Sequence, residues 1–236
     1  YAALAAGLAL ACATTLPTGP GDTTAEHGMV AAAHPDAARA GLEILKEGGN
    51  AVDAAVAVAF ALTVAEPNAS GIGGGGFALI AMADGSRPVV VDYRETAPRA
   101  ATPERYYGSK ESFAALTEEG ALAVGVPGLV AGAAKALELH GTKTLAEVLR
   151  PAIRLAREGI VVTPRLASIA ADKHGKLLRY PAAAAVYLPD DFPTAEGTRL
   201  VNEDLARTFE AIAAGGPPAF YEGAIGRAVV AEVQAR

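Results

Sequence analysis

One apolar segment constrains the fold more than any other part of this chain. Residues 51–66, AVDAAVAVAFALTVAE, are apolar on nearly every side of a helix, and Pro67 ends the segment. At about sixteen residues the segment is shorter than the ~20 that a helix needs to cross a bilayer. Asn50, which precedes it, is a residue type that caps helix N-termini. We therefore expect a buried core helix.

A glycine-rich run follows this helix. Residues 71–76, GIGGGG, match the dinucleotide-binding pattern G-x-G-x-x-G letter for letter. That pattern binds a pyrophosphate when a strand precedes the glycines and a helix follows them, because the helix N-terminus holds the anion. Here the order is reversed, since a helix comes first and two strand-like segments follow, residues 77–83 and 89–94. The sequence therefore predicts a β-hairpin and argues against a dinucleotide site.

The role of the glycines is then open to two interpretations. Glycine permits positive φ angles and close backbone contacts, so the run can be a tight passage from helix to strand. It can also be a packed or ligand-facing loop, because it holds more glycines than a simple turn requires. The residues alone leave both interpretations standing.

The strands of the predicted hairpin are apolar on both faces, apart from Asp92 and Arg94 at the end of the second strand. Strands of this kind are typically covered on both sides by other layers. Together with the buried helix that precedes them, they predict a layered α/β sandwich.

Helical periodicity marks further segments along the chain. Thr144 and Glu147 form a capping box, and we expect Pro151 to bend or interrupt the helix that this box opens. Asn202 is the expected cap of a helix that ends at glycine. The last predicted helix reaches the end of the sequence without a stop signal, so we expect the chain to be part of a longer one. The predicted helices begin near residues 35, 51, 127, 144, 202 and 222.

Composition and charge argue against several classes of function. The formal net charge is -6 and no cluster of Lys and Arg occurs, so a nucleic-acid partner is not expected. The 4 histidines are scattered and the chain has 1 cysteine, so we expect no structural zinc site. We expect neither a metal nor an organic cofactor.

The N-terminal residues 1–26 have the pattern of an export segment followed by a polar tether. Residues 1–11 are almost all apolar or glycine, too few to span a bilayer, and are typical of the end of a signal peptide. The stretch LALAC, which ends at Cys12, resembles a bacterial lipoprotein signal, although Ala9 stands where that pattern prefers leucine. A plain secretory signal is the alternative. Both predict a periplasmic or extracellular protein, whose only membrane tether would be a lipidated Cys12; the Pro-, Gly- and Thr-rich residues 13–25 would form the flexible link.

The clearest candidate for chemistry is Arg94, in the stretch VVVDYRETAP. It lies where the second predicted strand ends, and strand alternation puts Asp92 and Arg94 on one face and Tyr93 on the other. A guanidinium at a strand end near a glycine loop can hold a substrate carboxylate through two parallel hydrogen bonds. The alternative is a structural ion pair with Asp92 or a neighbouring acid such as Glu95. No nucleophile stands out, because Ser70 lacks the G-x-S-x-G elbow.

Beyond the leader, the chain resembles a known family. The resemblance is carried by GMVAAAHPDAARAGLEILKEGGNAVDAAVAVAFALTVAEPNASGIGGGGFALI and by DYRETAP, which closely resemble the start of the large subunit of gamma-glutamyltransferases, also called glutathione hydrolases. It continues through GVPG at residues 125–128, RPAIRLAREGIVVTP and LVNEDLARTFEAIAAGGPPAFYEG. Several long motifs in the same order make chance a poor explanation.

This resemblance implies an α/β fold of the N-terminal nucleophile (Ntn) hydrolase type, an αββα sandwich. Residues 27–236 would form the N-terminal part of the large subunit, a single incomplete domain. The family implies a proenzyme that cleaves itself and frees a threonine at the N-terminus of a small subunit. That threonine attacks the γ-glutamyl amide, and water or the amine of an amino acid or peptide accepts the acyl group.

The resemblance assigns one substrate-binding residue in this chain. Arg94 matches the arginine of the family's R-E-x-A-P motif, which binds the α-carboxylate of the γ-glutamyl group. The nucleophilic threonine belongs to the later part of family sequences, so we expect the chain to be inactive alone and identify no catalytic residue in it. The alternatives are a related Ntn acylase, acting on a β-lactam side chain or on poly-γ-glutamate, and a non-catalytic exported scaffold.

Overall fold

The computed structural model describes residues 24–107 and 113–235. The predicted export segment, with Cys12, lies outside the described residues except for residues 24–26. The signal peptide, the tether and the lipidation therefore stay predictions.

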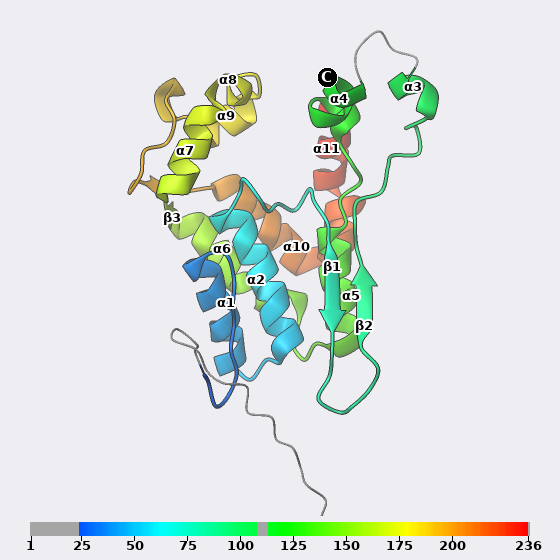
Figure 1. Cartoon of the computed structure of the whole chain (residues 1–236), viewed down its shortest axis with the longest axis vertical. Coiled ribbons are helices and arrows are strands. Elements are labelled where there is room, and N and C mark those ends of the chain that lie inside the picture. Colours follow the sequence, from blue (N-terminus) through cyan, green and yellow to red (C-terminus); the bar gives the residue numbers. More distant parts are fainter. Residues whose placement is uncertain (1–23, 108–112, 236) are drawn as a thin grey trace, which may run out of the picture.

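The described residues form mainly helices, with two short antiparallel strand pairs, β1–β2 and β3–β4 (Figure 1). In chain order the elements are α1 (Pro35–Lys46), α2 (Ala51–Ala65), β1 (Phe77–Ile80), β2 (Val89–Asp92), α3 (Pro103–Tyr107), α4 (Phe113–Glu118), η1 (Ala121–Ala123), α5 (Leu129–His140), α6 (Leu145–Glu158), β3 (Ile160–Val161), α7 (Pro164–Asp172), α8 (His174–Leu177), α9 (Pro181–Tyr187), η2 (Pro189–Asp191), β4 (Arg199–Leu200), α10 (Glu203–Tyr221) and α11 (Ala224–Gln234).

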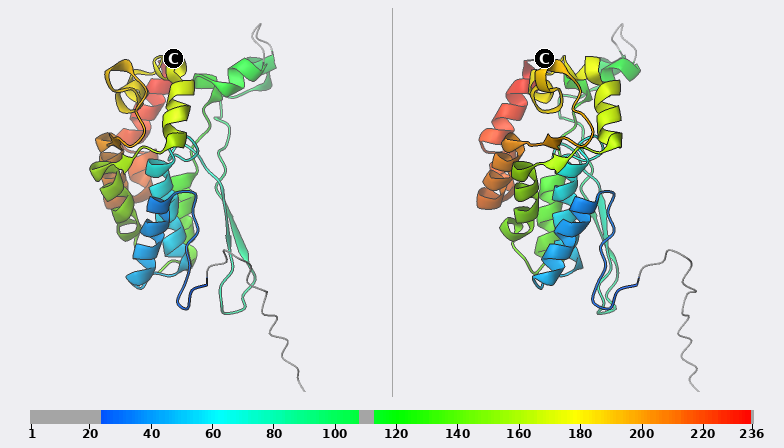
Figure 2. Two further views of the ribbon diagram at one scale, coloured as in Figure 1. Left: turned by 60° about the vertical axis from the view of Figure 1, so that its left-hand side comes forward. Right: turned by 90° about the vertical axis from the view of Figure 1, so that its left-hand side faces the viewer.

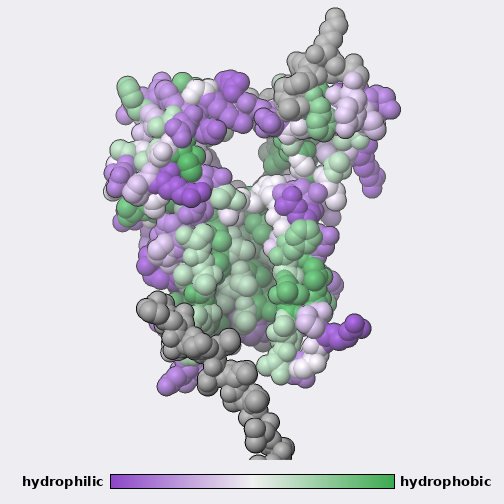
Figure 3. Space-filling view, in the orientation of Figure 1, coloured by the Kyte–Doolittle hydropathy of each residue, from purple (hydrophilic) through white to green (hydrophobic). Residues whose placement is uncertain are grey.

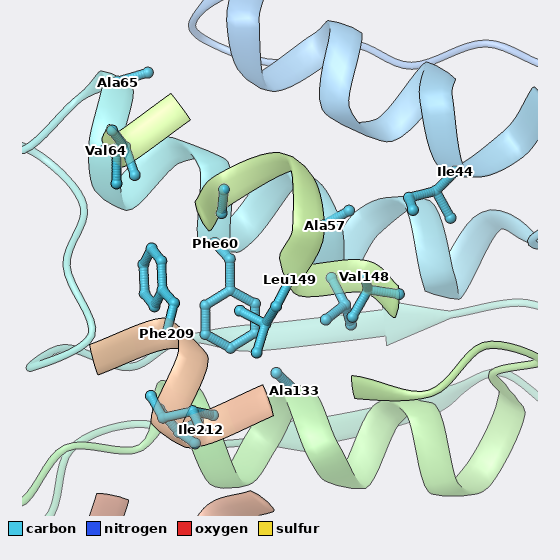
Figure 4. Close-up of a cluster of buried hydrophobic side chains, with 14 of the residues drawn as sticks. Ile44, Ala57, Phe60, Val64, Ala65, Ala133, Val148, Leu149, Phe209 and Ile212 are labelled. Carbon is cyan, nitrogen blue, oxygen red and sulfur yellow. The ribbon is translucent and has the colours of Figure 1, made fainter. Parts of the chain in front are cut away.

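The core lies where α2, α6, α10 and α5 meet (Figure 4). Phe60 of α2 and Phe209 of α10 are fully buried and pack edge to face, with ring centroids 5.7 Å apart. Leu149 of α6 and Ala133 of α5 lie beside them. The predicted burial of the apolar segment 51–66 is confirmed: neighbouring helices cover α2 on most sides, so its sequence needs no polar stripe.

Residues that adjoin a helix in the sequence determine several of the helix ends. The Asn50 side chain accepts from the backbone N–H groups of Val52 and Asp53, and Thr144 forms the predicted capping box with Glu147. Gly48 has a φ of 83°, the left-handed conformation expected where α1 ends.

Pro151 lies inside α6, and Gly216 lies inside the span of α10. α6 runs unbroken through Pro151, so the predicted interruption is absent. Proline removes the backbone donor to the carbonyl of Glu147, and that carbonyl instead accepts a hydrogen bond from Arg150 Nε at 3.3 Å. In α10 the predicted glycine stop is present as a break, because Gly216 has φ 65° and ψ -164° inside the span 203–221.

The β1–β2 hairpin forms as predicted but is covered on one face only. Leu79 pairs with Val90, and both point outward, with 74% and 59% of their surfaces exposed. Ile80 and Val91 are buried against the helices. The prediction that both faces are covered is thus not met within the described residues: the outer side of the hairpin is open in both views of Figure 2. An apolar pattern on both faces predicts cover on both sides, and the described residues supply cover on one side only.

An apolar groove runs between α2 and the hairpin, with α5 at its base. Its volume is about 590 Å³, and its walls include Val52 and Val56 of α2, Phe77 and Leu79 of β1, and Ala133 of α5. Figure 3 shows the resulting apolar surface over α2 and the hairpin. Among the described helices, none has both the length and the apolar character needed to cross a membrane.

Candidate functional site

The backbone around Arg94 is held from both edges. Before it, Tyr93 continues the β1–β2 pairing: its N–H donates to Gly76 O at 2.9 Å, and its carbonyl accepts from Gly76 N at 3.3 Å. After it, Thr96 forms an antiparallel bridge with Val126, whose N–H donates to Thr96 O at 2.8 Å. The segment that carries Arg94 therefore lies between the glycine-rich run on one edge and the segment leading into α5 on the other.

The Arg94 side chain projects to the surface. The alternation predicted from the sequence is observed, since Asp92 and Arg94 are exposed while Tyr93 is half-buried. The Arg94 guanidinium lies 3.3 Å from Glu95 Oε2, and 57% of the Arg94 side chain stays exposed. Asp92, the other candidate partner, instead accepts the backbone N–H of Arg94 at 3.0 Å. One neighbouring acid thus engages the guanidinium, which still offers an accessible surface to a ligand.

The glycine-rich run packs on this segment. Gly74 O accepts hydrogen bonds from Gly128 N at 2.9 Å and from Leu129 N at 3.0 Å, so the run is joined to the start of α5. A Cβ atom on Gly75 would overlap Tyr93 O and lie 3.1 Å from the carbonyl carbon of Arg94. Of the two interpretations left open, the run is both the passage into β1 and a packed loop, and its glycines allow backbone to approach backbone.

Tyr93 anchors the segment on the side opposite Arg94. Its ring occupies the space beside Gly132, where a Cβ atom would lie 2.6 Å from Tyr93 Cδ1. Burial raises the pKa of the Tyr93 hydroxyl, so this side chain stays neutral. The sequence around Arg94 predicts no role for Tyr93. The signal that points to one is Gly132, because a glycine inside a helical pattern commonly has a packing reason.

Tyr221, near the end of α10, fastens the start of α5. Its hydroxyl donates to Pro127 O at 3.0 Å and accepts from Ala131 N at 3.1 Å. Burial raises the pKa of Tyr221 more than the Ala131 N–H lowers it. No local pattern predicts this contact, because its partners are about ninety residues apart along the chain.

The described residues hold no cluster suited to a metal. Within residues 24–107 and 113–235, no three His, Cys, Asp or Glu side chains come together as ligands. The site offers a guanidinium that can pair with a carboxylate, on a backbone hydrogen-bonded along both edges and next to Tyr93, which lines the apolar groove. That arrangement can bind and orient an anionic substrate, but it contains no identified nucleophile.

Sequence comparisons connect this arrangement to known proteins. A family model described as gamma-glutamyltranspeptidase matches residues 37–236. The Acylase ACY 1 proenzyme of Pseudomonas sp. (strain SE83) is 49% identical over 209 residues, which are 86% of this chain and 37% of that protein. The glutathione hydrolase proenzyme of Bacillus subtilis (strain 168) is 42% identical over 210 residues, 88% of this chain and 35% of that protein. The chain thus spans little more than a third of these relatives.

The fold agrees with the sequence comparisons. The crystal structure of Helicobacter pylori gamma-glutamyltranspeptidase matches with a TM-score of 0.83 and 38% sequence identity, covering 88% of this chain and 60% of that chain. The predicted fold class is therefore confirmed: the chain has the mixed helix and sheet architecture of part of an Ntn hydrolase fold. The family model covers well over half of the sequence, and so the chain belongs to the gamma-glutamyltranspeptidase family.

Proposed function

We propose that this chain is the N-terminal part of an exported γ-glutamyl hydrolase or transferase that acts on glutathione and related γ-glutamyl compounds. The placement of Arg94 carries the proposal: its guanidinium stands exposed at the end of β2 on a backbone held from both edges. A planar guanidinium matches a carboxylate through two parallel hydrogen bonds. The similarity to a glutathione hydrolase proenzyme supports a glutamyl donor with such a carboxylate.

In the proposed reaction, Arg94 binds the α-carboxylate while an N-terminal threonine, from the later part of the precursor, attacks the γ-carbonyl carbon. The amide C–N bond breaks, the amine leaves with a proton, and the acyl group stays on the threonine as an ester. Water then releases glutamate, or the amine of an amino acid or peptide takes the γ-glutamyl group. Because the threonine belongs to the small subunit, residues 1–236 alone would be inactive.

The partner in this proposal is the small subunit from the same precursor, seated on the outer face of the hairpin and in the groove beside α2. Phe77, Leu79 and Val90 expose 63%, 74% and 59% of their surfaces on that face. An apolar patch of this kind marks an interface more often than a free surface. The relatives that support the proposal are themselves described as proenzymes.

This partner can be tested at Leu79. In the full-length precursor, Leu79→Asp is expected to lower the yield of associated subunits by about tenfold or more, because the interface would have to bury an unpaired carboxylate. The matched control is Leu178→Asp, which introduces the same charge at another exposed leucine, 44% exposed, away from the hairpin. Gel electrophoresis and size-exclusion chromatography measure cleavage and association. Normal association of Leu79→Asp would show that the hairpin face stays open.

One observation favours a second candidate, an acylase acting on a different acyl group. The acylase ACY 1 proenzyme is 49% identical to the chain, against 42% for the glutathione hydrolase proenzyme. Arg94 is compatible with both functions, because a glutaryl group carries the same terminal carboxylate as a glutamyl group and lacks only the α-amine.

A panel of three acyl anilides separates the candidates. With the full-length protein we expect turnover of the γ-glutamyl anilide, slower turnover of the glutaryl anilide, and very little of the 4-aminobutanoyl anilide, which lacks the α-carboxylate. Release of the aniline is followed by absorbance, with and without an amino-acid acceptor. Preference for the glutaryl donor would establish the acylase instead, and no turnover of any donor by cleaved protein would leave a non-catalytic scaffold.

We also propose that the protein is exported to the periplasm or the extracellular space, on the basis of residues 1–26. Lipidation of Cys12 would then hold it at a membrane through the polar tether. Mass spectrometry of the mature N-terminus distinguishes a lipid-modified Cys12 from a plain secretory cleavage, and an intact, uncleaved leader would contradict export.

A further inference from the structure

We propose that Tyr93 is the positioning residue for Arg94, and that Gly75, Gly128 and Gly132 form a cradle that fixes Tyr93. This inference rests on the proposed function, because it concerns how the carboxylate-binding cation is held. Glycines of the glycine-rich run and of the segment around α5 then share one role, which is to leave room for Tyr93. A turn or a nucleotide-binding loop would not require glycine at these positions.

The first part of the cradle acts on the backbone of Tyr93. Cβ atoms on Gly75 and on Gly128 would both overlap Tyr93 O, and that on Gly128 would also lie 2.8 Å from the Tyr93 carbonyl carbon. Two chain segments, one before β1 and one before α5, therefore reach the same peptide group. Only glycine leaves room for both of them.

The second part acts on the Tyr93 side chain. A Cβ atom on Gly132 would overlap Tyr93 Cβ and Cγ, so the side chain fills the place that an α5 side chain would take. On the other side, Gly76 would bring a Cβ atom within 3.2 Å of Tyr93 Cε2. Gly132 does not have a left-handed φ angle and lies inside α5, where glycine weakens a helix relative to alanine. The contribution of Gly132 to the structure is therefore the space that it leaves for the Tyr93 side chain.

Fixing Tyr93 restricts Arg94. Their peptide bond is planar, so the Tyr93 carbonyl group sets the position of the Arg94 nitrogen and Cα. Asp92 Oδ1 accepts a hydrogen bond from that nitrogen at 3.0 Å, and the buried Glu95 Oε2 lies 3.3 Å from the guanidinium. Tyr93 points into the fold and Arg94 points out of it, so a shift of the half-buried ring moves the exposed cation.

The test uses a double-mutant cycle in the full-length protein. Gly132→Ala is expected to raise the KM for a γ-glutamyl anilide on the order of 10- to 100-fold with a much smaller change in kcat, because a displaced cation weakens donor binding. Tyr93→Gly removes the atoms that the new methyl group would strike. In that background, Gly132→Ala is therefore expected to raise the KM no further, so the two changes are strongly non-additive.

Gly128→Ala is the matched control. Its methyl group meets the backbone carbonyl of residue 93, which Tyr93→Gly leaves in place, so its effect should persist in both backgrounds. If Gly132→Ala is too poorly folded for kinetics, Gly76→Ala applies a milder push on the ring and should show a smaller KM increase that also disappears with Tyr93→Gly. Additive effects of Gly132→Ala and Tyr93→Gly, or a loss confined to kcat, would overturn the inference.

A separate readout distinguishes failure of the inference from failure of the proposed function. If the cleaved wild-type protein turns over no γ-glutamyl donor, the proposed function fails, and amide hydrogen exchange tests the cradle. Val126 N bonds to Thr96 O across the Arg94 segment. Gly132→Ala should speed exchange of the Val126 amide when Tyr93 is present and add nothing in the Tyr93→Gly background. Unchanged exchange in the single variant would contradict the cradle whatever the activity.

Discussion

Replacing Arg94 by alanine in the full-length precursor is expected to lower kcat/KM for a γ-glutamyl amide by roughly 30- to 1,000-fold. The reason is the loss of a charge-assisted, two-point contact with the α-carboxylate, worth about 2–4 kcal/mol. Each 1.4 kcal/mol corresponds to about tenfold in an equilibrium constant, which gives this range. Steady-state kinetics with a γ-glutamyl anilide measure the effect.

Two controls make the Arg94 result specific. Arg94→Lys keeps the charge but not the planar pair of donors, so it should recover part of the loss. The 4-aminobutanoyl anilide has no α-carboxylate, so its slow turnover should change little between wild type and Arg94→Ala. An equal loss for both donors, or wild-type kinetics for Arg94→Ala, would remove Arg94 from the binding site.

The second large effect concerns Asp53, which is fully buried. Its carboxylate accepts from Asn50 N at 2.7 Å, Thr142 N at 2.9 Å, Thr142 Oγ1 at 2.7 Å and Lys143 N at 3.0 Å. Asp53→Ala would leave these donors without their acceptor and is expected to destabilise the protein by about 3–5 kcal/mol. In a precursor as long as its relatives, with about 2.1 cal/mol/K of unfolding entropy per residue, this corresponds to a melting temperature roughly 3–4 °C below wild type. The control is Asp84→Ala, at an exposed loop residue, which should change the melting temperature little. A shift of the same size in this control would show that the effect is not specific to Asp53.

The pH dependence of stability provides an independent check on Asp53. Burial raises the pKa of Asp53, but hydrogen bonds from Thr142, Asn50 and Lys143 together outweigh it and hold the pKa below its ordinary value. A carboxyl group with a lowered folded-state pKa stabilises the fold above its unfolded pKa, about 4, and loses that contribution as the pH falls through the folded value. The stability difference between wild type and Asp53→Asn should therefore shrink below about pH 4. A constant difference down to pH 3 would contradict this assignment.

Those parts of the fold that depend on neighbouring residues could be predicted from the sequence. Asn50 and Thr144 cap helices because each cap needs only the next three residues. The hairpin is likewise encoded by two apolar runs around a short turn. Asp53 shows the limit: three of its four hydrogen-bond donors belong to residues 142 and 143, about ninety positions away, and no spacing rule predicts such a contact.

Some features of the candidate site could likewise be predicted from the sequence, and others could not. The position of Arg94 at a strand end, and its projection opposite Tyr93, follow from strand alternation. The choice of Glu95 over Asp92 as its ion-pair partner does not, because it depends on how the segment leaves the strand. The close fit of Gly132 against Tyr93 also joins residues from two separate elements. Physical reasoning from single residues left the role of Arg94 open, and its assignment through the resemblance to the family's R-E-x-A-P motif stays a proposal.

The uncovered side of the hairpin also bears on biosynthesis. In a precursor as long as its relatives, synthesis of the residues after 236 takes tens of seconds at about 5–20 residues per second. Through that interval β1 would present an apolar strand whose second edge has no strand partner among the described residues, an arrangement that favours aggregation of nascent chains. If the chain is part of such a precursor, a chaperone that covers this strand during elongation would therefore set the yield of folded protein, independently of its final stability.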